Sequence, residues 1–120
     1  MRLITAFVYD SKTAEQSERL LRSVAITGNY HGYWYLVCAA DLVLEDPTRL
    51  HLITKRLYRD IAQIYKTTPG AVERGIRTAI QSGWERGSNA AFEPLMGYLP
   101  KECPSNAEFI DSIVHKIRRG

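Results

Sequence analysis

Apolar side chains recur at intervals of three and four residues along most of this chain, which is the period of an amphipathic α-helix. The segments with this pattern are residues 13–26, 31–45, 50–65, 69–86, 90–96 and 105–119. Residues 50–65 fit either one helix or two closely joined helices, and residues 3–9 could be a short strand or an irregular start. After residue 9 no segment shows the alternating apolar and polar pattern of a β-strand. The sequence therefore predicts an all-α protein, a compact bundle of about six helices.

Helix-breaking residues give several of these segments defined ends. Thr27-Gly28-Asn29 should end the first, since Gly and Asn tolerate the left-handed conformation at a helix C-terminus. Asp46-Pro47 should end the second, because the residue before proline is pushed out of helical geometry. Thr68 fits the N-cap of the fourth segment and Pro69 its first position. Residues 105–108 form a capping box that should open the last helix.

The length of 120 residues suits one domain. We place a helix-turn-helix domain at residues 20–120 and treat residues 1–19 as an N-terminal extension that could form part of the first helix. No apolar run approaches the roughly 20 residues that a bilayer requires, and no signal peptide pattern is present. We therefore expect a cytoplasmic protein that does not enter a membrane.

The sequence offers no catalytic or metal-binding constellation. The two cysteines, Cys38 and Cys103, make no CxxC motif, and the three histidines share no ligand spacing. No Gly-rich phosphate loop, nucleophile elbow or carboxylate pair occurs either. We expect no enzyme activity, no catalytic residue, no metal and no cofactor.

Positive charge is concentrated in the middle of the chain. Residues 49–87 carry eight basic and three acidic side chains, a net charge of +5, whereas the whole chain carries +3. Such a block is typical of a surface that binds a polyanion, although charge alone favours an ordinary solvated surface.

The same block contains a helix-turn-helix pattern in residues 61–77. One helix should end near Tyr65, a turn of three or four residues should follow, and a second helix should begin. Ala62 is small where the two helices cross, and Val72 and Ile76 are apolar where the second packs on the first. In a helix-turn-helix protein the second helix enters the DNA major groove. The alternative is a pair of helices joined by a tight turn in a plain bundle.

The second helix of this pattern divides into two faces. Its inward positions should be Val72, Ile76, Ala79, Ile80 and Trp84. Its outward positions should be Glu73, Arg74, Arg77, Thr78 and Gln81. Arginine can bind guanine through two hydrogen bonds, and glutamine can do the same for adenine. Glu73 could accept a hydrogen bond from cytosine or hold Arg77 as its i,i+4 partner. We expect contacts with the DNA backbone or secondary contacts from Lys55, Lys66, Thr68, Thr78, Gln81 and Arg86.

Several stretches match a known family in order and spacing. They are GYWYL at 32–36, ITKRLYRDIA at 53–62, TT at 67–68, VERGIRTAI at 72–80, WERG at 84–87, GY at 97–98 and PSNAEFI at 104–110. With them, residues 20–118 resemble the C-terminal DNA-binding effector domain of the stage zero sporulation protein A family, the sporulation response regulators. The resemblance implies an all-helical domain that reads a short DNA box with Glu73, Arg74 and Arg77.

The resemblance also implies partners. The family binds tandem boxes as a pair of domains, and it contacts the RNA polymerase sigma subunit through a region that corresponds to residues 87–98. The residues before position 20 are too few for the family's phosphoacceptor receiver domain, so we expect none here.

Two positions depart from the family pattern. Ala71 stands where a basic residue is frequent, and Thr78 stands where a histidine is common. They favour an alternative, in which a module of this fold binds a sigma factor or another regulator in place of DNA. Arg74, Arg77 and the basic block favour a sequence-specific double-stranded DNA-binding regulator more strongly.

Overall fold

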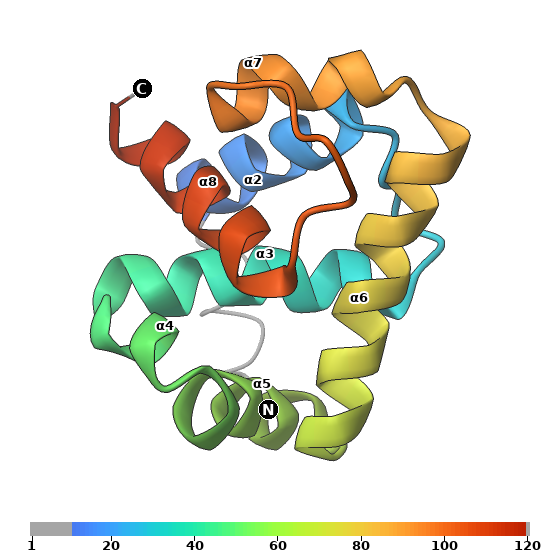
Figure 1. Cartoon of the computed structure of the whole chain (residues 1–120). Helices are drawn as coiled ribbons and strands as arrows, with labels where there is room; N and C mark the ends of the chain where they lie inside the picture. Colours follow the sequence, from blue (N-terminus) through green and yellow to red (C-terminus); the bar gives the residue numbers. More distant parts are fainter. Residues whose placement is uncertain (1–10, 120) are drawn as a thin grey trace.

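A computed structural model describes residues 11–119, which form a bundle of helices without a strand in that range (Figure 1). The elements are α2 (Ser11–Ser23), α3 (His31–Glu45), α4 (Thr48–His51), the π-helix η1 (Ile53–Tyr58), α5 (Arg59–Tyr65), α6 (Pro69–Arg86), the 3₁₀-helix η2 (Asn89–Ala91), α7 (Phe92–Met96) and α8 (Asn106–Arg119). The predicted all-α bundle is confirmed. The possible strand at residues 3–9 lies outside the described residues.

The helix bounds agree with the sequence where local signals are strong. The helices α3 and α6 begin and end at the predicted residues. The first helix ends at Ser23 and not at Ile26, so the predicted end at Thr27-Gly28-Asn29 was wrong. Ala25, with φ of 64°, takes the left-handed conformation instead, and the backbone N–H of Ile26 donates to the carbonyl of Leu21 at 3.0 Å. Residues 48–65 divide into three consecutive helices, because a π-helix separates α4 from α5.

The central element is α3, which is apolar on nearly every side. Its residues 35–40 are all buried, as expected for a helix with neighbours on every side. Figure 1 shows α3 crossing the middle of the molecule, with α2 and α8 on one side, α4 and α5 on the other, and α6 running past its N-terminal end. The core is therefore built around α3, and α6 lies at its rim.

A close crossing of two backbones fixes α6 against α3. A Cβ atom on Gly32 would overlap the carbonyl oxygen of Gly75 and would lie 2.6 Å from its carbonyl carbon. Gly83 approaches the backbone before α3 in the same way, since a Cβ there would lie 2.5 Å from the carbonyl oxygen of Val24. Only glycine permits such approaches. The orientation of α6 is thus set by two contacts along its length.

No helix within residues 11–119 is both long and apolar enough to cross a bilayer.

Candidate nucleic-acid interface

The helices α5 and α6 are joined by a turn of residues 66–68. Lys66 ends α5 in the left-handed conformation, with φ of 55°, and its backbone N–H donates to the carbonyl of Ala62. Thr68 is extended, and its hydroxyl oxygen accepts a hydrogen bond from the backbone N–H of Ala71 at 3.1 Å. Pro69 occupies the first helical position, so the predicted start of α6 is confirmed. The backbone conformation of Lys66 and the hydrogen bond to Thr68 therefore fix the direction in which α6 begins.

The outward face of α6 is a polar stripe. Arg74, Arg77, Thr78 and Gln81 are exposed, and within residues 11–119 the side chains of Arg74, Thr78 and Gln81 make no hydrogen bond or ion pair. The opposite face is fully buried and consists of Val72, Ile76, Ala79, Ile80 and Gly83. This division agrees with the prediction, except that Trp84 is half-buried and meets the ring of Phe92 edge-on at 5.1 Å.

One residue of the stripe is held from within the helix. The guanidinium of Arg77 donates to the carboxylate of Glu73, one turn earlier. Of the two roles that the sequence allows Glu73, the intrahelical partner of Arg77 is the one present in the free protein. This pairing presents Arg77 in one orientation without burying it, since its side chain stays 49% exposed.

A side chain from the last helix braces the same part of α6. The amide nitrogen of Asn106 donates to the backbone carbonyl of Glu73 at 3.2 Å and to the hydroxyl of Tyr58 at 3.0 Å. The capping box of α8 is formed, because Ser105 and Glu108 exchange hydrogen bonds between side chain and backbone. Asn106 was not among the predicted site residues. Its place beside a capping box suggested only a helix start, and the contact spans 33 residues of sequence.

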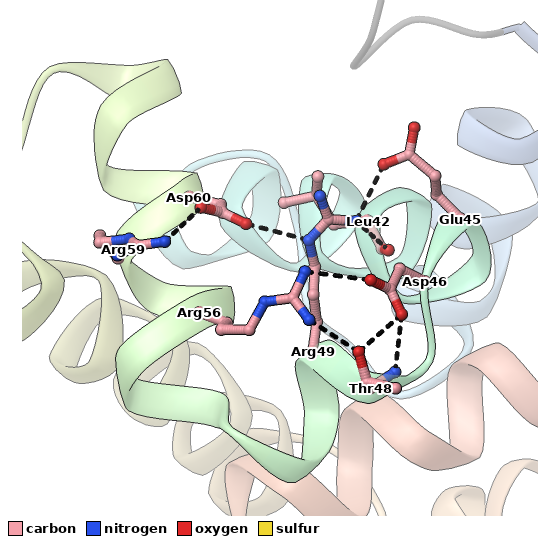
Figure 2. Close-up of polar contacts among 8 residues, drawn as sticks. All are labelled: Leu42, Glu45, Asp46, Thr48, Arg49, Arg56, Arg59 and Asp60. Atoms are coloured by element: carbon pink, nitrogen blue, oxygen red, sulfur yellow. Dashed lines mark hydrogen bonds and ion pairs between the residues drawn. The ribbon is translucent and has the colours of Figure 1, made fainter.

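Half of the central basic block is engaged in ion pairs, and three of these four arginines belong to two separate groups of contacts (Figure 2). Arg49 donates to Asp60 at 3.0 Å and to the carbonyl of Leu42 at 2.8 Å, and it also pairs with Glu45. Arg56 donates to Asp46 at 3.0 Å and to Thr48, while Arg59 approaches Asp60. The Arg49 group ties the end of α3 to α4 and α5, and the Arg56 group ties the residue after α3 to α4 and η1. The carboxylates in these groups neutralise arginines that the sequence pattern assigned to a polyanion-binding surface.

The remaining cations of the block are available at the surface. Lys55 on η1, Lys66 at the end of α5 and Arg74 on α6 are exposed, without an ion pair in the described part of the chain. Arg86 lies over the ring of Tyr30 at 5.8 Å. It is twelve residues beyond Arg74, about 18 Å along α6 and about a third of a turn around it. The structure thus brings Arg74, Arg77, Thr78 and Gln81 onto one face and places Arg86 on another.

A helix of 18 residues with an anchored apolar face and an exposed stripe of Arg and Gln can enter a major groove. The model of the family described as "Sporulation initiation factor Spo0A C terminal" matches residues 17–117 of the chain. This chain belongs to that family. Members of this family are the DNA-binding effector domains of sporulation regulators, and the family is not one of enzymes. The general function of the chain is therefore DNA binding in transcription regulation.

Proposed function

We propose that this chain is a sequence-specific double-stranded DNA-binding regulator that reads the major groove with α6. The observation that carries the proposal is the outward stripe of α6, which is exposed along residues 74–81 while the opposite face is buried. The three-residue turn between α5 and α6 supports the proposal, because a short turn also precedes the recognition helix in helix-turn-helix proteins.

Each residue of the stripe has a proposed role. Arg74 binds a guanine through two hydrogen bonds, because it is exposed early in the helix and has no protein partner in the described residues. Arg77 reads a second base in the orientation that Glu73 gives it, or Glu73 turns to a cytosine. The proposed contacts with phosphates or neighbouring bases come from Lys55, Lys66, Thr68, Thr78, Gln81 and Arg86.

Replacing Arg74 with alanine tests the base-reading role. Arg74→Ala should lose about 1–3 kcal/mol of discrimination between the preferred box and a scrambled duplex, because one bidentate contact is removed. Titrations of both duplexes in a band-shift or anisotropy assay measure this difference. Arg19→Ala on α2 is the matched control, since Arg19 is also exposed on a helix and lies outside the proposed interface. Equal discrimination by the Arg74 and Arg19 variants would refute the assignment.

The finer partners are proposals of the same kind. We propose that residues 20–120 form the DNA-binding domain and that two copies pair mainly on DNA that carries two boxes. We also propose contact with the RNA polymerase sigma subunit through residues 87–98. Asn89, Glu93 and the half-exposed ring of Tyr98 are available in this segment for such a contact. A regulator of this kind acts where the chromosome is, which makes the cytoplasm its proposed location.

A further inference from the structure

An open depression of about 460 Å³ lies at the N-terminal end of α3. It is lined by the turn before α3, the first turns of α3 and the last residue of α5, namely Gly28, Asn29, Tyr30, His31, Trp34, Tyr35 and Tyr65. Tyr33 and Tyr35 are buried, but Tyr30, Trp34 and Tyr65 are only half-buried. Part of this aromatic surface is therefore accessible from solvent.

The depression borders the flank of α6. A Cβ atom on Gly75 would lie 3.0 Å from the ring of Tyr35, and the hydroxyl of Ser82 donates to the hydroxyl of Tyr30 at 2.9 Å. These two contacts lie about 10 Å apart along α6, beside the exposed stripe. Tyr65 meets Tyr35 at 5.3 Å between ring centres and directly precedes the turn into α6. The aromatic surface thus runs alongside the helix that would enter the groove.

The chemistry of the depression suits an anion joined to an apolar group. Among residues 11–119, none that lines the depression carries a carboxylate. Arg86 lies over the ring of Tyr30, and the exposed Lys66 follows Tyr65 in the sequence. Asn29 is exposed, and its side chain makes no hydrogen bond within the described residues. A nucleic-acid backbone offers both components, phosphate oxygens for polar donors and deoxyribose for aromatic rings.

The widths of the major groove and of a helix indicate that a DNA backbone would pass along this flank of α6. The major groove is about 12 Å wide, and a helix with its side chains has a diameter of about 10–12 Å. When α6 fills the groove, the structures packed against its flanks face the two strands that border the groove. The aromatic depression at the N-terminal end of α3 lies on one flank of α6, and Asn106 of α8 lies on the other flank.

We propose that this depression holds the sugar–phosphate backbone of the DNA strand that passes beside α6. Asn29 and His31 are then positioning residues that bind phosphates, and the rings of Trp34 and Tyr65 support the sugars. The proposal rests on the proposed function and adds a second, sequence-independent contact surface to it. Its contribution to affinity should be the same for every duplex, because phosphates carry no sequence information.

The variant Asn29→Asp tests the contact with a change of one charge and almost no change in shape. A carboxylate just before the N-terminus of α3 is compatible with folding, because the helix dipole favours it there. Gln16→Glu makes the same change from amide to acid on α2, which packs on α3 and α8. Asn29→Asp should weaken binding to the box and to a scrambled duplex by the same factor, about three- to tenfold. Gln16→Glu should change neither affinity appreciably.

The outcomes separate this proposal from the proposed function. Box preference in the wild type together with equal affinities for Asn29→Asp and Gln16→Glu would overturn the backbone contact and leave base reading by α6 intact. Loss of box preference alone in Asn29→Asp would also overturn it, since a phosphate contact acts on all duplexes. A wild type without box preference would contradict base reading by α6, and a uniform loss in Asn29→Asp would then still support the backbone contact.

A spectroscopic measurement gives an independent readout. The chain has two tryptophans, so the variant Trp84→Phe leaves Trp34 as the only one. Bound duplex should shield Trp34 from acrylamide quenching if the backbone occupies the depression. Unchanged quenching at saturating duplex would place the DNA elsewhere, and it would leave the depression to another ligand, such as a peptide side chain.

Discussion

Replacing Gly32 with alanine should destabilise the whole protein, because α3 and α6 touch through their backbones at this point. The added methyl group would lie 2.6 Å from the carbonyl carbon of Gly75 and 2.8 Å from Cβ of Ala79. Ordinary contacts between carbon atoms are about 3.5–4.0 Å. The two helices would therefore have to separate by about 1 Å, and no flexible side chain is present at the clash to absorb the change.

The size of the effect follows from two opposing contributions. Overpacking of a filled core costs about 1–3 kcal/mol, and the upper end applies here because the obstacle is mainly backbone. Alanine in a helix gains about 1 kcal/mol over glycine, which offsets part of that cost. We expect a net loss of about 2 kcal/mol in unfolding free energy, which lowers the melting temperature by about 4–10 °C.

A second glycine of the same region supplies the control. Gly28 lies in the turn before α3, where an added Cβ would meet only the rings of Trp34 and Tyr33 at 3.9 Å. Gly28→Ala should therefore leave the melting temperature within a few degrees of the parent or raise it slightly. Thermal and urea unfolding of both variants measure the difference. If Gly32→Ala and Gly28→Ala melt together, then α3 and α6 do not cross through these two glycines and the orientation of α6 has another cause.

The parts of the fold that the sequence predicts best are those with strong local signals. The C-terminus of α3 follows from Asp46-Pro47, and the start of α6 follows from Thr68 and Pro69. In each case one or two neighbouring residues determine the backbone, so no tertiary information is needed. The end of α2 differs because Ala25, and not Gly28, takes the left-handed conformation. Packing of Leu21, Val24 and Ile26 in the core favours that earlier stop over the intrinsic preference for glycine.

The charge of the candidate site could be predicted only in part. The sequence shows a block of net +5 in residues 49–87, but it does not show which cations are neutralised. Asp46 and Glu45, which pair with Arg56 and Arg49, lie outside that block at the end of α3. These pairs depend on how α3, α4 and η1 fold back on one another. The exposed positive charge is consequently smaller than the linear count, and the cations of the block without an ion pair in the described residues are Lys55, Lys66, Arg74 and Arg86.

Contacts between distant segments account for what the sequence missed at α6. The pattern suggested Ala62 as the small residue at a helix crossing, and Ala62 is buried. The closest approach of α6, however, is made by Gly75 on Gly32 of a helix more than 40 residues earlier. Asn106 reaches Glu73 across a similar separation. Neither a helical period nor a capping signal identifies the partner of such a residue. The contacts of Gly75 with Gly32 and of Asn106 with Glu73 are therefore visible only in the folded chain.

Two further changes test the packing of α6 and the contacts of Asp46 with Thr48 and Arg56. Trp84→Ala should lower the unfolding free energy by about 2 kcal/mol, because Trp84 is half-buried against Phe92. This loss is smaller than the loss for a fully buried aromatic side chain. A urea midpoint equal to that of the wild type would contradict the packing of Trp84. The last prediction concerns Asp46, whose pKa falls to about 2 because the hydroxyl of Thr48, the guanidinium of Arg56 and the backbone N–H of Thr48 stabilise its ionised form. The folded-state pKa thus lies below the unfolded value of about 3.9. The carboxylate therefore stabilises the fold fully above about pH 4, and this contribution is lost as the pH falls through about 2. The difference in unfolding free energy between the wild type and Asp46→Asn should shrink steadily between about pH 5 and pH 2. A difference that stays constant over this range would mean that Thr48 and Arg56 do not stabilise the ionised carboxylate.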